Sequence, residues 1–343
     1  MVGLDRARVA SVDYSFVMLS RRSFIGCGSA VAFAACPALA AGPARVLDAH
    51  VHFYDPTRPQ GVPWPSKSES VLYKPTYPER YLANIKPFRV DGVVAVEASP
   101  WLEDNLWLLE VADRSRLVWA VVGHLQPGNP AFKDALERFS RHPLFRGIRI
   151  NAGSISAIVA QPEALNGLKL LAAKDLSLDI LLDGPRSLAG ITRLAGMLPD
   201  LRLVLGHLPL DAPLDEAGRA AYGDDLRALG RAAYEDDLRV LGRAPSVYAK
   251  VSAVARRIGG QVPTDAGFYK PGLDTIWQAF GPARVIYASN WPVCDLTAPY
   301  ATVFRIVRDY LADKDQETVE RYFWKNAQDA YKCHPREGGK ATM

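Results

Sequence analysis

Short apolar segments alternate with amphipathic segments along most of the chain. Eight runs of a few residues are rich in Val, Ile, Leu and Ala, as is typical of strands buried on both faces. Between them apolar residues recur every three or four positions, as Leu188, Ile191 and Leu194 do, which predicts helices with one buried face. The predicted strands are Val46–Val51, Gly92–Glu97, Val118–Gly123, Gly147–Ile150, Ser177–Leu182, Arg202–Leu205, Val247–Val251 and Val285–Ala288.

Eight alternating strand–helix units predict an α/β fold with a parallel sheet covered by helices. They match a single-domain (β/α)8 barrel of the TIM type, which needs roughly 250 residues plus loops. A doubly wound sheet is the alternative, but no glycine-rich phosphate-binding loop follows an early strand. Residues 218–241 form a near-identical tandem repeat, GRAAYGDDLRAL followed by GRAAYEDDLRVL. This repeat predicts a helical excursion after the sixth strand, since a solenoid needs three or more copies.

The segment 1–40 differs from the rest of the chain. Residues 20–25, SRRSFI, precede a mildly apolar stretch that ends in Ala38-Leu39-Ala40, a small-residue cleavage pattern. The segment resembles a bacterial twin-arginine export signal, which predicts a periplasmic barrel over 41–343. Pro37 interrupts the apolar stretch, so a permanent membrane span is disfavoured. Lipid attachment at Cys36 is a minor alternative.

Charge and cysteine content exclude several partners and classes. The 343 residues carry 41 Lys and Arg against 37 Asp and Glu, a formal charge of +4. This near-balance argues against a nucleic-acid surface and leaves a small molecule as the expected partner. Four scattered cysteines are too few for a disulfide framework. The oligomeric state is open.

Candidate catalytic residues follow the predicted strands. The first strand leads into Asp48-Ala49-His50-Val51-His52, and residues two apart on a strand share a face. His50 and His52 therefore form a metal-binding or proton-handling pair. His207 follows the sixth strand and Glu97 ends the second. In a barrel, the carboxyl ends of the strands form the catalytic face.

These motifs, together with Ser289-Asn290-Trp291-Pro292-Val293 after the eighth strand, resemble the amidohydrolase-related (amidohydrolase 2) family of the amidohydrolase superfamily. The resemblance extends over residues 46–332. Members include 2-pyrone-4,6-dicarboxylate lactonase, sugar-acid lactonases and, more distantly, metal-dependent aromatic decarboxylases. It implies a barrel hydrolase with His50, His52, His207 and position 290 at its catalytic centre.

Position 290 departs from the family pattern, where the usual residue is an Asp that activates water. The amide of Asn290 has no ionisable proton near neutral pH and cannot act as a general base. Three explanations are open. Another carboxylate, Glu97 or Asp295, takes over; a bound metal activates water by itself; or hydrolysis has been lost or replaced.

The sequence leaves two alternatives for the cofactor, a bound divalent metal and a metal-free site. His50, His52, His207 and Glu97 together make a ligand set that suits a divalent metal, with zinc favoured. The resemblance also covers metal-free lactonases, in which histidines and arginines hold the substrate instead.

Further residues are candidates for binding substrate. Arg149 and Lys250 end the fourth and seventh strands and are expected to grip a carboxylate. Trp291, with the loop aromatics Trp64, Tyr73 and Trp101, is expected to form an aromatic wall. His124 is expected to be part of the wall, and Asp183 to orient a neighbouring group.

The sequence thus predicts a hydrolase that opens a lactone or related cyclic ester of a carboxylated small molecule. Two alternatives remain. One is metal-dependent, nonoxidative decarboxylation of an aromatic acid. The other is a catalytically decayed binding protein, which the Asn at position 290 would explain.

Overall fold

The structure is a computed structural model that describes residues 42–182, 187–208 and 231–336. The predicted export segment 1–40, Asp183 and the first copy of the repeat lie outside the described residues. The barrel belongs to the compact unit Leu39–Met343. Residues 231–241 of the second copy lie in helix α9 (Arg231–Arg243).

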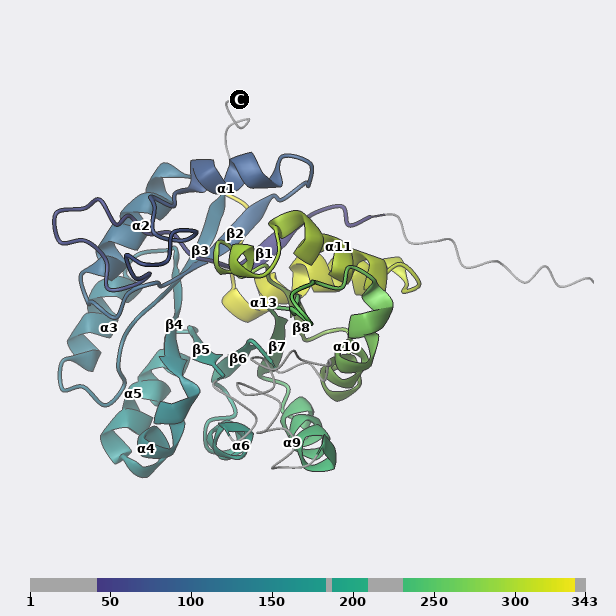
Figure 1. Cartoon of the computed structure of the whole chain (residues 1–343). Coiled ribbons are helices and arrows are strands. Elements are labelled where there is room, and N and C mark those ends of the chain that lie inside the picture. The colour runs from purple at the N-terminus through teal and green to yellow at the C-terminus, as the bar shows by residue number, and fades with distance from the viewer. Residues whose placement is uncertain (1–41, 183–186, 209–230, 337–343) are drawn as a thin grey trace, which may run out of the picture. The chain divides into compact units, whose positions relative to one another are not determined.

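Eight parallel strands follow one another around the sheet in chain order (Figure 1). This order matches a TIM-type barrel and excludes the doubly wound alternative, whose strand order reverses. The strands are β1 (Leu47–Val51), β2 (Gly92–Val96), β3 (Val118–Gly123), β4 (Phe145–Asn151), β5 (Ser177–Leu181), β6 (Arg202–Gly206), β7 (Val247–Val251) and β8 (Val285–Tyr287).

The predicted strands are confirmed to within one residue at each end, apart from the start of the fourth. The fourth strand begins at Phe145 rather than Gly147 and extends to Asn151. Its burial pattern is interrupted by Arg146 and Arg149, so hydrophobicity alone shortens it. The eighth strand ends at Tyr287, before Ala288.

The barrel is nearly closed between its first and last strands. Val51 forms a parallel bridge with Trp291, and His52 N–H donates to the Trp291 carbonyl oxygen at 2.9 Å. The seam therefore lies at the two segments that carry the predicted histidine pair and Asn290.

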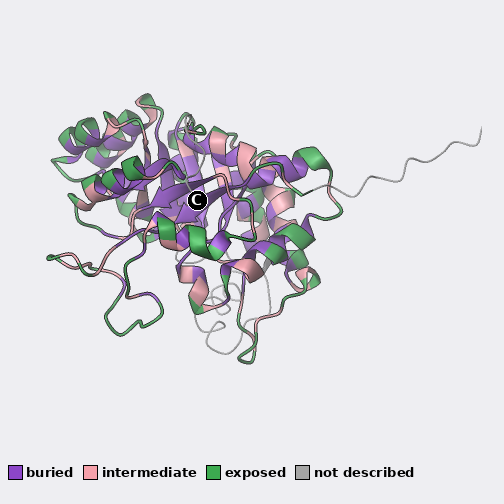
Figure 2. Cartoon of the chain, turned by 90° about the horizontal axis from the view of Figure 1, so that it is seen from above, coloured by how far each residue is buried: buried purple, intermediate pink, exposed green. Residues whose placement is uncertain are grey.

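Helices surround the strands, and their inner faces pack on the sheet (Figures 1 and 2). Buried residues fill the sheet and the inner helix faces, whereas exposed residues lie on the outer faces. The helices are α1 (Pro78–Ile85), α2 (Asp104–Arg114), α3 (Phe132–Ser140), α4 (Ile155–Ala160), α5 (Pro162–Ala173), α6 (Leu188–Met197), α9, α10 (Ala266–Phe280), α11 (Tyr300–Tyr310), α12 (Gln316–Glu320) and α13 (Asn326–Tyr331).

A second apolar cluster joins strands from different sides of the sheet. It combines Ala49, Val94, Ala120 and Val204 with Tyr331 of α13. Strands that are not neighbours can share such a cluster only through the inside of the barrel. The barrel therefore has a packed core rather than a pore, as the fold requires.

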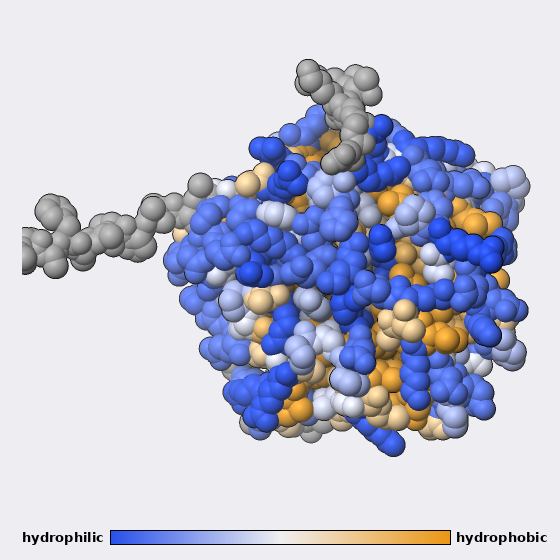
Figure 3. All heavy atoms as spheres, turned by 180° about the vertical axis from the view of Figure 1, so that it is seen from behind, coloured by the Kyte–Doolittle hydropathy of each residue, from blue (hydrophilic) through white to orange (hydrophobic). Residues whose placement is uncertain are grey.

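The outer surface is mostly polar. Figure 3 shows the molecule from behind, where hydrophilic residues cover most of the face and apolar atoms are visible between them. Within the described residues, no helix is both long enough and apolar enough to span a bilayer.

A glycine fixes the approach of two helices in this outer ring. A Cβ added at Gly242 of α9 would lie 1.9 Å from the Ala279 carbonyl oxygen of α10, a backbone atom. We predict that Gly242→Ala lowers the free energy of unfolding by about 2 kcal/mol, because overpacking pushes the helices apart. Urea denaturation measures the change.

Gly196→Ala in α6 is the matched control, since a Cβ there meets nothing within 4 Å. It should leave stability unchanged or raise it by up to about 1 kcal/mol through helix propensity. Equal destabilisation by both substitutions would contradict the packing argument.

Candidate active site

A cavity of about 420 Å³ opens at the carboxyl ends of the strands. Side chains that follow or end β1, β2, β3, β4, β6 and β8 line it. They are His52, Glu97, His124, Arg149, His207 and Asn290, with Trp64 from the loop after β1. This position is the catalytic face of a parallel barrel, so the structure brings most of the predicted site residues together.

The histidine pair lies at the end of β1, where His52 lines the cavity and His50 lies directly behind it, outside the lining. His50 Nε2 and His52 Nε2 are 3.0 Å apart, and both residues are buried. His52 Nδ1 lies 2.9 Å from the Val96 carbonyl oxygen. Because a carbonyl only accepts, Nδ1 carries the proton of neutral His52, and Nε2 presents a lone pair toward His50.

His207 completes a cluster of three imidazoles. Its ring centroid lies 4.9 Å from that of His50. The Ser252 hydroxyl accepts a hydrogen bond from the His207 backbone N–H at 3.0 Å and lies 3.0 Å from Nδ1. His207 has a φ of 57°, in the left-handed region that residues other than Gly seldom adopt, although Asn, Asp and His do so more often than the rest. Ser252 helps to hold His207 in this conformation.

Burial keeps all three imidazoles neutral. Desolvation, with the positive charge of Lys250 next in importance, lowers the pKa of His50 well below its usual value. Desolvation and Arg149 lower the pKa of His52 to about 4 and that of His207 to about 3. At neutral pH each ring therefore has one nitrogen lone pair that can bind a metal or accept a proton.

Asp48 supports the pair from below. Its carboxylate accepts hydrogen bonds from Ser289 N–H at 2.8 Å, Tyr81 O–H at 2.8 Å and His50 N–H at 3.3 Å. Complete burial nevertheless raises the pKa of Asp48 to about 6. This residue links β1 to the segment that carries Asn290.

Glu97 is engaged by a neighbouring cation. Arg149 Nε donates to Glu97 Oε1 at 2.8 Å, and Arg149 Nη2 donates to the Glu97 carbonyl oxygen at 2.9 Å. His124 Nδ1 lies 3.9 Å from the same carboxylate. Although burial opposes ionisation, Arg149 and His124 lower the pKa of Glu97 to about 2. Glu97 is therefore a weak base and a counterion for Arg149.

Asn290 follows β8 and lines the cavity. It is buried and has a φ of 60°, which Asn adopts more readily than most residues. Its Oδ1 has no hydrogen-bond partner among the described residues. The amide can therefore hold a water or a substrate hydroxyl, although it cannot remove a proton.

Two predicted substrate contacts lie outside the lining of this cavity. Lys250 is fully buried, and its Nζ donates to Asp179 Oδ2 at 2.7 Å, across the inside of the barrel. Trp291 is fully buried and packs on Tyr81. That these two residues contact substrate stays a prediction.

The remaining candidates divide in the same way. His124 and Trp64 line the cavity, as expected of wall residues, whereas Tyr73 and Trp101 do not. Asp295, the other carboxylate considered as a base, also lies outside the cavity lining.

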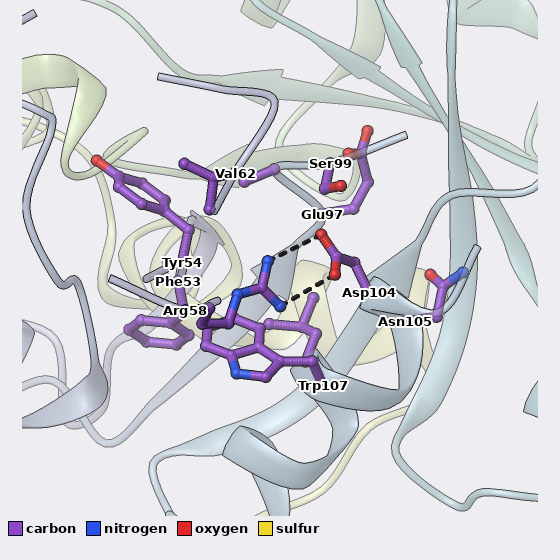
Figure 4. A pocket seen from close by; sticks show the side chains of 11 residues that line it. Phe53, Tyr54, Arg58, Val62, Glu97, Ser99, Asp104, Asn105 and Trp107 are labelled. Atoms are coloured by element: carbon purple, nitrogen blue, oxygen red, sulfur yellow. Dashed lines mark hydrogen bonds and ion pairs between the residues drawn. The ribbon is translucent and has the colours of Figure 1, made fainter. Parts of the chain in front are cut away.

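The loop that carries Trp64 is tied to α2 by a buried ion pair. Arg58 donates from both Nη atoms to Asp104, at 3.0 and 3.1 Å, and lies over the Trp107 ring (Figure 4). Glu97 and Ser99 border the same small pocket, which encloses about 20 Å³. Since this volume holds about one water, the pocket is too small for a substrate. The Arg58–Asp104 pair beside it anchors the loop.

The donor chemistry of the histidine cluster fits a divalent metal. The rings are neutral, the His50 and His52 Nε2 atoms face each other, and buried His50 Nδ1 has no partner among the described residues. No group of three or more His, Cys, Asp or Glu side chains in the described ranges is arranged to hold an ion as it stands. The fit rests on His50, His52 and His207, since Glu97 is bound to Arg149.

Two residues of the site escaped sequence analysis. Asp48 was visible in the Asp-x-His-x-His motif, but only the fold shows that it joins the two ends of the barrel. Ser252 follows β7 and has no sequence signal, because its role depends on the left-handed backbone of His207.

A parallel eight-stranded barrel with imidazoles at the carboxyl-end mouth defines a class of enzymes that act on small molecules. Within that class, the chain belongs to the amidohydrolase family, whose model matches residues 47–333. It is a hydrolase of this family.

Similar proteins support the assignment. L-fucono-1,5-lactonase of Burkholderia ambifaria is 27% identical over 259 residues, 74% of this chain and 82% of the relative. The L-fucono-1,5-lactonase of Burkholderia multivorans is 25% identical over 286 residues, 81% and 92%. An amidohydrolase from Burkholderia multivorans, solved with bound zinc, has a TM-score of 0.72 and 25% identity; the match covers 85% of this chain and all of that one, 100%.

The Glu97–Arg149 pair gives stability a specific pH dependence. Because the pKa of Glu97 is lowered to about 2 in the folded state, its contribution is present above the unfolded value near 4.5 and is lost as pH falls toward 2. We predict that Glu97→Gln lowers the free energy of unfolding at pH 7 by on the order of 2 kcal/mol. The difference should shrink between about pH 5 and pH 3 in urea titrations.

Glu103→Gln is the control, because Glu103 pairs with Arg138 at an exposed surface. Its effect should stay below about 1 kcal/mol. A pH-independent effect of Glu97→Gln would show that the carboxylate charge is not what stabilises the fold.

Proposed function

We propose that this amidohydrolase opens the lactone ring of a sugar acid by adding water to the ester carbonyl. The observation that carries the proposal is the cluster of three neutral imidazoles beside a cavity of about 420 Å³. The relatives named L-fucono-1,5-lactonase support this substrate class. In the reaction, the water oxygen attacks the carbonyl carbon, the ring C–O bond breaks, and the leaving oxygen takes a proton to give a hydroxy acid.

Different side chains at the site carry out different steps of this reaction. The lone pairs of the imidazoles accept hydrogen bonds from the attacking water, and one imidazole takes its proton and returns it to the leaving oxygen. Asn290 holds the water by its unpartnered Oδ1. Arg149, fixed by two bonds to Glu97, stabilises negative charge on the carbonyl oxygen and then on the carboxylate product.

A divalent metal would change the role of the imidazoles, since a lone pair that binds a metal can no longer accept the proton of the water. His50, His52 and His207 would hold it, and zinc is favoured because the donors are neutral nitrogens. When bound, it would supply Lewis-acid polarisation of the carbonyl. The zinc in the related Burkholderia multivorans amidohydrolase supports this proposal.

The test is a panel of sugar-acid lactones assayed by proton release with the purified protein. We predict that His50→Ala or His207→Ala lowers kcat/KM at least tenfold, because each removes a nitrogen that contacts the reacting groups. Elemental analysis of the same preparations should show a divalent metal in the wild-type protein and its loss in His50→Ala.

His334→Ala is the matched control, since His334 is exposed near the end of the described chain. It should retain full activity and metal content. Unchanged rates in the His50 and His207 variants would refute the catalytic assignment. Ligand binding without turnover, with activity appearing only in Asn290→Asp, would identify a decayed binding protein.

We also propose that the protein is exported to the periplasm by a twin-arginine signal. The proposal rests on the pattern of residues 20–25 and the Ala38-Leu39-Ala40 cleavage pattern. These residues lie outside the described structure.

Fractionation of bacteria that express the full chain tests the export proposal. Replacing Arg21 and Arg22 together by Lys should retain the protein in the cytoplasm, because the signal needs the paired arginines. Arg6→Lys with Arg8→Lys is the control and should leave export unchanged. Loss of membrane association in Cys36→Ser would instead identify a lipoprotein.

A further inference from the structure

A second hollow joins the catalytic cavity at its side. It encloses about 550 Å³ between the loop after β3 and the segment from the end of β4 to α5. His124, Ile150 and Asn151 line both this hollow, here called the side groove, and the catalytic cavity. The two hollows therefore border each other at these three residues.

The side groove carries no Asp, Glu, Lys or Arg among the residues that line it. Its polar groups include the primary amides of Gln126, Asn151 and Gln161, all exposed. Within the described residues, none of these amides has a hydrogen-bond partner. Each offers two donors and one acceptor, so together they can both donate to and accept from the hydroxyl groups of a ligand.

Apolar surface backs these amides. Pro127, Ile150 and Ile158 are buried residues that line the same hollow. A sugar ring has hydroxyls around its rim and C–H groups on its faces, so a groove with amides beside an apolar floor matches both parts. No Lys or Arg lines the groove to balance the charge of a carboxylate or a phosphate.

We propose that the side groove is a subsite for a second, uncharged sugar ring, so that the preferred substrate is the lactone of a disaccharide acid. This inference rests on the proposed lactone hydrolysis and extends it. Pockets of roughly 300–1,000 Å³ bury most of a drug-sized ligand. The cavity of about 420 Å³ can hold a single lactone ring, and the groove adds about 550 Å³ beside it.

The test compares two lactones that share one reacting ring, glucono-1,5-lactone and maltobiono-1,5-lactone. The wild-type protein should hydrolyse the disaccharide lactone with the higher kcat/KM. Gln126→Ala with Gln161→Ala should lower kcat/KM for that substrate about tenfold, through two lost hydrogen bonds, and change the value for the monosaccharide by less than about twofold. Ala157→Trp fills the groove. It should abolish the preference for the disaccharide lactone and leave hydrolysis of glucono-1,5-lactone unchanged.

Gln278→Ala is the matched control, because Gln278 is an exposed amide on α10, away from the groove. It should change neither substrate. No preference for the disaccharide, or an equal loss of both activities in the groove variants, overturns the subsite.

The failure of the proposed function is distinguishable from the failure of the subsite. If the wild-type protein hydrolyses neither of these lactones nor any other in the panel of sugar-acid lactones, the lactonase proposal is wrong. Calorimetric titration with maltobionic acid then decides on the groove by itself. Binding that is tighter than that of gluconic acid and weakened in the groove variants supports the subsite, whereas absent or unchanged binding overturns it.

Discussion

The site depends on one buried carboxylate at the seam of the barrel. The first strand is joined to the segment after the last strand by the Val51–Trp291 bridge and the bond from His52 N–H to the Trp291 oxygen. Asp48 reinforces this junction by accepting bonds from Ser289 and His50 backbone N–H groups. Burying the carboxylate is costly, as its pKa of about 6 shows. The hydrogen bonds of Asp48 fix the register of the two segments that carry the histidine pair and Asn290. The same contacts therefore close the barrel and set the geometry of the site.

The chemistry of the site follows from desolvation rather than from any one residue. Burial and nearby cations lower the pKa of all three histidines, which keeps them neutral. Burial also strengthens the attraction between Glu97 and Arg149, and the carboxylate stays ionised. The mouth thus contains neutral nitrogen donors beside one fixed ion pair, an arrangement that suits a neutral ester substrate with an oxygen that becomes negative during reaction.

Periodicity and strand-end position predicted the barrel and the histidine cluster, because both depend on local patterns that every parallel barrel shares. The same rule does not reveal depth in the barrel. Lys250 is buried and bonded to Asp179, and Trp291 lies at the seam and packs on Tyr81. The ion pair of Glu97 had no sequence signal either, since only the folded register brings Arg149 of β4 to the end of β2. The side groove had no signal, because its amides come from two loops that are joined only in space.

Asn290 keeps two properties of the Asp that the family pattern has at this position, its backbone conformation and its side-chain shape. Asn and Asp are the residues that most readily adopt the left-handed backbone, so the turn after β8, with a φ of 60° at this position, is compatible with either. The amide keeps the shape of the carboxylate and an acceptor oxygen but removes a negative charge from beside three imidazoles. Without that charge, the pKa values of the histidines lie lower, and the rings remain neutral over a wider pH range. In the proposed lactone hydrolysis, a group other than the side chain at position 290 must therefore take the proton of the water.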